Sequence, residues 1–230
     1  MGGDALKPDE ALWQWGPILL NATILWTWVV MVVLSLGSWL ITRRRSDPQR
    51  PSRRQVLLEV IVTALRDQIR DVSRQEPGPY LGFVGTLFLF IAVANLLSIV
   101  PGYVSPTSSL STTAALATCV FAAVPLYGIG HLGFRGYLQQ YIQPTVFMLP
   151  FNIIGELSRT LALAVRLYGN MMSGAMIGAM LLAFAPLFAP VPMQLFGLLI
   201  GTIQAWIFAI LAMVYIASAT QAHESREGQS

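Results

Sequence analysis

The stretch LALAVRLYGNMMSG, residues 161–174, carries one charged side chain, Arg166, in a segment that otherwise has the composition of a membrane-spanning helix. The guanidinium keeps its charge at physiological pH because the pKa of arginine lies above ~12. Holding it at the centre of a spanning helix costs about 2.5–3.5 kcal/mol. A cation kept there at that cost predicts a functional site inside the membrane.

The composition of the chain supports a membrane setting. Of the 230 residues, 55% are hydrophobic and 11% are charged, against about 25% charged in soluble domains. Nine of the fourteen Lys and Arg residues lie between Arg43 and Arg74, and residues 77–222 hold only four formal charges. The sequence therefore predicts an all-α polytopic membrane protein. Nucleic acid is not an expected partner, because most of the surface has to face lipid.

Segments of about 20 apolar residues are needed to cross a ~30 Å hydrocarbon core, and five segments meet that requirement. We expect a single membrane domain over residues 1–230, with about five transmembrane helices. Its parts are an outer N-terminal segment (1–17), span 1 (18–41), a basic cytoplasmic loop with a surface helix (42–79), span 2 (81–100), an outer loop (101–113), span 3 (114–129), a cytoplasmic loop (130–146), a long helix (147–185), a turn (186–192) and a last helix (193–222).

The basic residues also predict the orientation. With five spans, eleven Lys and Arg residues fall on the side of the Arg43–Arg74 cluster and only Lys7 falls on the other. The positive-inside rule then places the N-terminus outside and the C-terminus in the cytoplasm. Residues 151–185 and 193–219 would form helices about 52 Å and about 40 Å long, so we expect the last two helices to form a strongly tilted hairpin.

A polar stripe runs along the long helix. At 100° per residue, Arg159 and Arg166 lie within about 20° of each other, and Asn152 and Asn170 lie about 40° to either side of Arg166. Glu156 stands three residues before Arg159, the spacing of a salt bridge. That pair is either a structural ion pair or a part of an ion path.

Arg166 has no acidic partner of its own in this stretch. Glu156 is ten residues away, about 15 Å along a helix, and residues 77–222 contain no other carboxylate. Folding the hairpin about its turn brings Gln204 to within about two helical turns of the depth of Arg166. An amide can hydrogen-bond a guanidinium but cannot neutralise it, so we expect a carboxylate to come from another chain.

These residues resemble the a subunit of the F-type rotary ATP synthase. The resemblance rests on ELSRTLALAVRLYGNMMSG (residues 156–174) and GTIQAWIFAILAMVYIA (201–217), and extends to ANLLSIVPGY (94–103) and HLGFRGYL (131–138). It covers most of the chain beyond about residue 81. The RLxGNxxxG core followed by a glutamine is a highly specific pattern.

The resemblance implies a stator subunit in a bacterial inner (plasma) membrane. Such a subunit lies against a rotating ring of carboxylate-bearing c subunits, contacts b-type peripheral stalk subunits, and forms two offset aqueous half-channels. Arg166 would face the ring carboxylate, with Gln204 as its polar neighbour. The subunit is not an enzyme on its own, and we expect no cofactor and no bound metal.

The sequence also departs from the family pattern. Many bacterial members carry an acid at the position of Ala175 and a histidine at that of Gly197. Thr160 replaces a usual proline, Asn152 an acid, and Ser98 an aspartate of some relatives. These departures resemble the N-type side branch, which has been proposed to move sodium.

The candidates for lining the outer path are neutral. They are Asn95, Ser98, Ser109, Ser111 and Thr113. Asn95 could equally form a hydrogen bond between helices. The alternative function is a secondary transporter that binds an anionic substrate at Arg166. It predicts broken helices and internal repeats, and the sequence shows neither.

Overall fold

The computed structural model describes residues 11–15, 18–43, 53–73, 76–100, 103–142, 147–184 and 190–220. The predicted all-α fold is confirmed, and five helices are apolar and long enough to cross a bilayer. The helices are α1 (Ala22–Arg43), α2 (Arg53–Ser73), α3 (Gly78–Leu96), α4 (Leu110–Ile142), α5 (Met148–Phe184) and α6 (Pro190–Thr220), with two short 3-10 turns, η1 (Leu97–Ile99) and η2 (Pro106–Ser108).

The N-terminal part adds a short antiparallel hairpin that the sequence reading did not predict. Strands β1 (Ala11–Trp15) and β2 (Ile18–Asn21) pair there, so the first helix begins at Ala22 and not at residue 18. The expected N-terminal segment, the basic loop at 44–52 and most of the turn at 186–192 lie wholly or partly outside the described residues.

Helix α4 is longer than the sequence suggested and continues through the expected cytoplasmic loop. After Pro125 the next proline is Pro144, so nothing in residues 126–142 forces the helix to end. The chain changes direction inside α4 at Gly133, where φ is 70° and ψ is 162°. That combination is essentially restricted to glycine.

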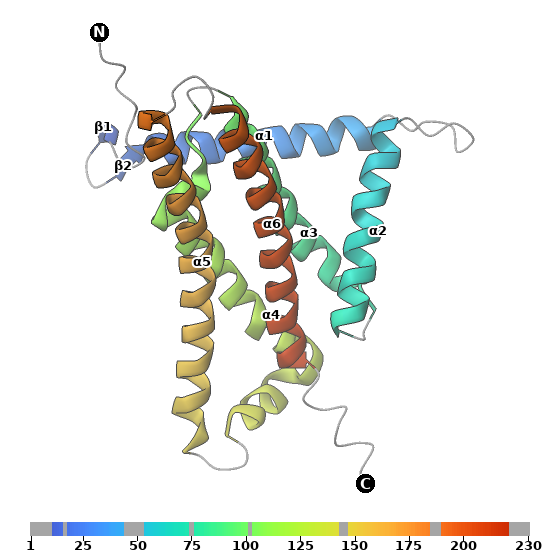
Figure 1. Ribbon diagram of the computed structural model, residues 1–230. Coiled ribbons are helices and arrows are strands. Elements are labelled where there is room, and N and C mark those ends of the chain that lie inside the picture. Colours follow the sequence, from blue (N-terminus) through green and yellow to red (C-terminus); the bar gives the residue numbers. More distant parts are fainter. Residues whose placement is uncertain are drawn as a thin grey trace.

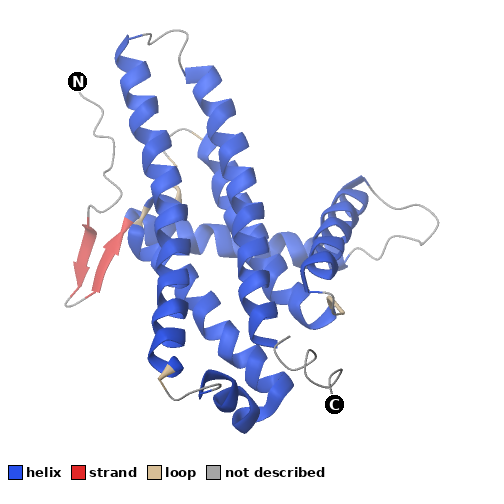
Figure 2. Cartoon of the chain, turned by 60° about the horizontal axis from the view of Figure 1, so that its bottom comes forward, coloured by secondary structure: helices blue, strands red, loops and turns tan. Residues whose placement is uncertain are grey.

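Helix α1 runs across the α5–α6 hairpin rather than alongside it (Figure 1, and from a second direction Figure 2). Because α1 and the hairpin run in different directions, they cannot both lie along the normal of one bilayer. Helix α5 has 37 residues, about 55 Å at 1.5 Å per residue, whereas α1 with 22 residues matches a ~30 Å core. The arrangement therefore fits an upright α1 and an inclined hairpin, as the sequence led us to expect.

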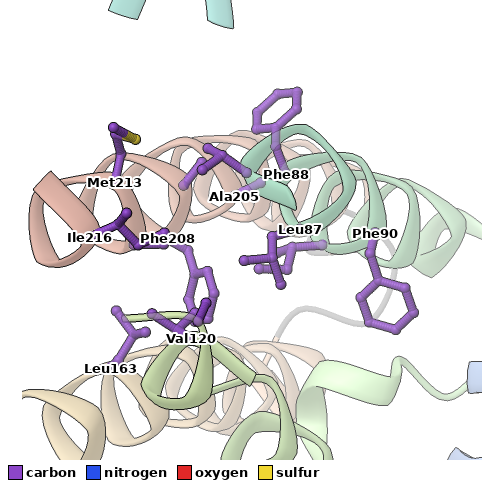
Figure 3. Packing of buried hydrophobic residues seen from close by; sticks show 14 of the residues in the cluster. Leu87, Phe88, Phe90, Val120, Leu163, Ala205, Phe208, Met213 and Ile216 are labelled. Atoms are coloured by element: carbon purple, nitrogen blue, oxygen red, sulfur yellow. The ribbon is translucent and has the colours of Figure 1, made fainter. Parts of the chain in front are cut away.

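Small residues on one face of α6 let the helices come close together. Ala205, Ala209 and Ala212 are at most 2% exposed, as is usual where membrane helices pack. Between them Phe208, which is fully buried, points toward Val120 of α4 and Leu163 of α5 (Figure 3). This core gives α6 a defined rotation about its axis.

Helix α2 packs on this core through its apolar side. Leu65 and Ile69 are nearly fully buried, and they lie in an apolar crevice with Trp206 and Met213 of α6. Arg66 and Arg70 of the same helix are exposed. The amphipathic pattern that predicts a surface helix thus also serves to attach α2 to the bundle.

Helix α5 is the least covered of the long helices. Three of the residues 149–184 are buried, compared with nine of the nineteen residues of α3. Leu163, Ala164 and Leu167 are the buried hydrophobic residues of α5. Most of the apolar surface of this helix is therefore available to lipid or to another protein.

Candidate functional site

Arg166 lies on the uncovered side of α5. Its side chain is exposed, whereas Leu163 and Leu167 beside it face the bundle and are at most 1% exposed. Among the residues that the structure describes, no carboxylate forms an ion pair with it. The guanidinium is therefore presented outward, toward whatever covers α5.

A hydrogen bond joins the two helices of the hairpin one turn beyond Arg166. Asn170 Nδ2 on α5 donates to Gln204 Oε1 on α6. Gln204 is 1% exposed, and its Nε2 is buried without an acceptor in the described part of the chain. A buried amide donor without an acceptor carries a cost in free energy.

The polar residues before Arg166 share one cavity. A space of about 480 Å³ between α4, α5 and α6 is lined by Asn152, Glu156 and Arg159 together with Thr160, Tyr215 and Ser218. The guanidinium of Arg159 lies over the ring of Tyr215, 5.8 Å from its centroid, a cation–π arrangement. The structure therefore brings Asn152 and Arg159 of the predicted stripe into one cavity with Glu156, while the pairing of Glu156 with Arg159 stays a prediction.

A second cavity lies on the other side of Arg166. It measures about 280 Å³ and is lined by Ser98, Asn170 and Gln194, and by Ala175 and Gly197. The two positions where the family often has an acid and a histidine thus open onto the same space. Gln194 was missed in the sequence reading, although an amide one turn before Gly197 on an apolar helix was the available signal.

The five residues predicted to line the outer path make different contacts. Ser98 lines the second cavity. Asn95 is 3% exposed and bonds to α6 and to η2. The hydroxyls of Ser109 and Ser111 bond to each other at 2.7 Å, and Thr113, which is fully buried, donates to the carbonyl of Leu110.

The segment between α3 and α4 carries one titratable group that is held neutral. Tyr103 packs edge-on against Trp26, with their ring centroids 4.8 Å apart. Burial raises the pKa of its phenol well above the ordinary value, and the nearby Ser105 opposes that shift only in part. Tyr103 therefore adds no charge to this part of the molecule.

Comparison with known proteins gives a consistent result. Residues 24–217 match the family described as ATP synthase A chain. The chain is 62% identical to ATP synthase subunit a 2 of Acaryochloris marina, over 94% of this chain and 93% of that protein. It is 60% identical to ATP synthase subunit a 1 of Chlorobaculum parvum, over 95% of this chain and 97% of that protein. It is 58% identical to ATP synthase subunit a of Albidiferax ferrireducens, over 96% of each chain.

Proposed function

The chain belongs to the ATP synthase A chain family, and from this premise we propose that it is the ion-translocating stator subunit of a rotary F-type ATP synthase, with Arg166 as the barrier between two half-channels. ATP chemistry then resides in other subunits, and this chain is a non-catalytic membrane part of the complex.

The observation that carries the proposal is the position of Arg166 between two separate cavities. On α5 the first cavity ends at Leu163 and the second begins at Asn170, an interval of about 10 Å along the helix. On α6 the cavities are lined by residues 193–200 and 215–219, and Gln204 lies between them. Arg166 and Gln204 therefore occupy the interval between the two cavities, which is where the barrier of this proposal would lie.

The chemistry follows from the charge. A ring carboxylate about 4 Å from Arg166 gains on the order of 4 kcal/mol at an effective dielectric near 20. This favours the ionised carboxylate and releases its bound proton or cation into the adjoining cavity. The same fixed positive charge repels a cation that would pass directly from one cavity to the other.

The polar residues of the first cavity provide the inner path in this account. Glu156 attracts a cation arriving from the cytoplasm, while Asn152 and Ser218 offer hydrogen-bonding groups to water. The second cavity provides the outer path, and its polar residues Ser98, Asn170 and Gln194 are neutral. The partners are the c-subunit ring, b-type stalk subunits and the bilayer, in a bacterial plasma membrane with the N-terminus outside and the C-terminus in the cytoplasm.

A secondary transporter is the alternative. Sites of that kind are built where helices are interrupted near the middle of the membrane. Helices α5 and α6 run without a break through Arg166 and Gln204, and this favours the stator.

The two-cavity arrangement is tested by labelling from each side. Cys119 is the only cysteine and is exposed, so the variants are made in a Cys119→Ser background. In assembled complexes a membrane-impermeant maleimide should react with Ser218→Cys from the cytoplasmic side and with Gln194→Cys from the outside. Val165→Cys, between the cavities, is the matched control and should react from neither side.

Labelling of Ser218→Cys and Gln194→Cys from the same side would contradict the proposal. So would equal labelling of Val165→Cys, because the interval around Arg166 would then be open to water.

A further inference from the structure

A buried amide near the end of α3 joins three elements. Asn95 Nδ2 donates to the carbonyl oxygen of Gly201 on α6 at 2.9 Å, and Asn95 Oδ1 accepts a hydrogen bond from Thr107 of η2 at 3.0 Å. Asn95 is 3% exposed and Thr107 is fully buried. Both polar atoms of the amide are therefore used within the protein, and neither is left to line a water path.

The contact between α3 and α6 at this point leaves no room for a side chain at position 201. A Cβ atom added at Gly201 would lie 2.7 Å from the Cβ of Asn95, where real Cβ atoms do not fit. The short approach is what allows the amide to reach the backbone of α6. The amide thus fixes the position of α6 along the length of α3.

The outer loop is fastened to the same amide. Ser105 and Thr107 share a hydrogen bond of 2.8 Å, and the hydroxyl of Ser105 also lies 3.5 Å from the carbonyl of Ala94. Ser105 and Thr107 are both buried. Residue Asn95 is therefore the point where α3, α6 and η2 are held together.

The held segment of α6 contains the functional amide. Gln204 follows Gly201 by three residues, about 4.5 Å along the helix and on nearly the same face. Its bond with Asn170 places it opposite α5, and α5 itself is largely uncovered. A slide of α6 along α3 would therefore move Gln204 away from Asn170 and from the level of Arg166.

We propose that Asn95 is a positioning residue for ion translocation: by holding the Gly201 carbonyl and Thr107, it keeps Gln204 at the level of Arg166. This inference rests on the function proposed above. Asn95 itself touches no transported ion.

The test compares coupling with the amount of complex. Asn95→Ala and Thr107→Val are assembled into the whole ATP synthase in liposomes, and ions moved per ATP hydrolysed are measured for each. This ratio should fall roughly two- to tenfold, the range expected for one lost buried hydrogen bond. A purely structural role would lower the yield of complex and leave the ratio unchanged.

Two conservative variants serve as controls. Thr107→Ser keeps the hydroxyl that bonds Asn95 and should keep the ratio of the unmodified protein. Thr86→Ala removes an exposed hydroxyl that bonds only within α3, at 2.6 Å to Gly82, and should also leave it unchanged.

The inference is overturned if Asn95→Ala keeps the normal ratio, or if Thr86→Ala lowers it as much. If Asn95→Ala and Thr107→Val both fail to assemble while Thr86→Ala assembles, the contact is a folding determinant and the inference is also overturned. An Arg166→Ala complex measured alongside separates the two claims. Normal pumping by that complex removes the proposed function, whereas failed pumping with an unchanged ratio in Asn95→Ala removes only the positioning role.

Discussion

Glu156 is the only acidic side chain between residues 77 and 222, and it lines the first cavity with Arg159 on the next turn of α5. A carboxylate in this place raises the local concentration of cations. The neighbouring guanidinium limits that effect and is itself held over Tyr215. The inner path that we propose therefore combines one attracting and one repelling charge.

Removing the attracting charge should slow transport without preventing assembly. A carboxylate attracts a cation about 8 Å away by about 1 kcal/mol at an effective dielectric near 40, so Glu156→Gln should reduce ion-coupled turnover about fivefold. Turnover is measured as ATP-driven pumping by reconstituted complexes between pH 6 and pH 9. Thr160→Ser, which keeps the hydroxyl that bonds the Glu156 carbonyl at 3.0 Å, is the control.

Normal turnover of the assembled Glu156→Gln complex over this pH range would show that Glu156 has no part in transport.

The sequence reveals some of the site residues and hides others for a physical reason. Arg166 stands out because a charge in an apolar helix is costly, and Asn152, Glu156 and Asn170 follow from helical periodicity. Thr107 and Gly201 are ordinary residues in their own segments. They acquire a role only through contact with Asn95, and Gly201 is 106 residues from it along the chain.

At the scale of the elements, hydropathy locates the helices but not their ends or bends. The five apolar stretches all form helices. The extension of α4 to Ile142 and its bend at Gly133 were not predicted, because glycine is compatible with both a loop and a kinked helix. The attachment of α2 to α6 was not predicted either, since an amphipathic face fits a lipid surface and a protein surface equally well.

The bend in α4 should depend on Gly133, whose backbone has the positive φ angle. Gly133→Ala places a side chain at φ 70°, which costs about 1–3 kcal/mol. We expect the subunit to be lost faster from purified complexes held at an elevated temperature. Gly130→Ala is the matched control, because an added Cβ meets nothing within 4 Å at either glycine and only Gly133 has a positive φ.

Equal half-times of loss for Gly133→Ala and Gly130→Ala would contradict this account of the bend.

At the scale of the whole molecule, two features set the function that we propose. The hairpin is inclined to α1 (Figure 1), so its uncovered face can extend along a partner surface over a long distance. The cavities at either side of Arg166 then reach that surface at different positions. Helix lengths predict the inclination. The two cavities arise from packing among η1, α4, α5 and α6, which the sequence pattern does not specify.

The central claim is that Arg166 both discharges a passing carboxylate and closes the direct path, and the most direct measurement is ion pumping by an Arg166→Ala complex in liposomes. With the guanidinium gone, about 4 kcal/mol of electrostatic interaction is lost. We predict that ATP no longer builds an ion gradient and that passive ion exchange across the complex increases. The control is Arg135→Ala, which removes an exposed charge on a different helix, α4, and should pump normally. An Arg166→Ala complex that still builds a gradient from ATP would contradict the account.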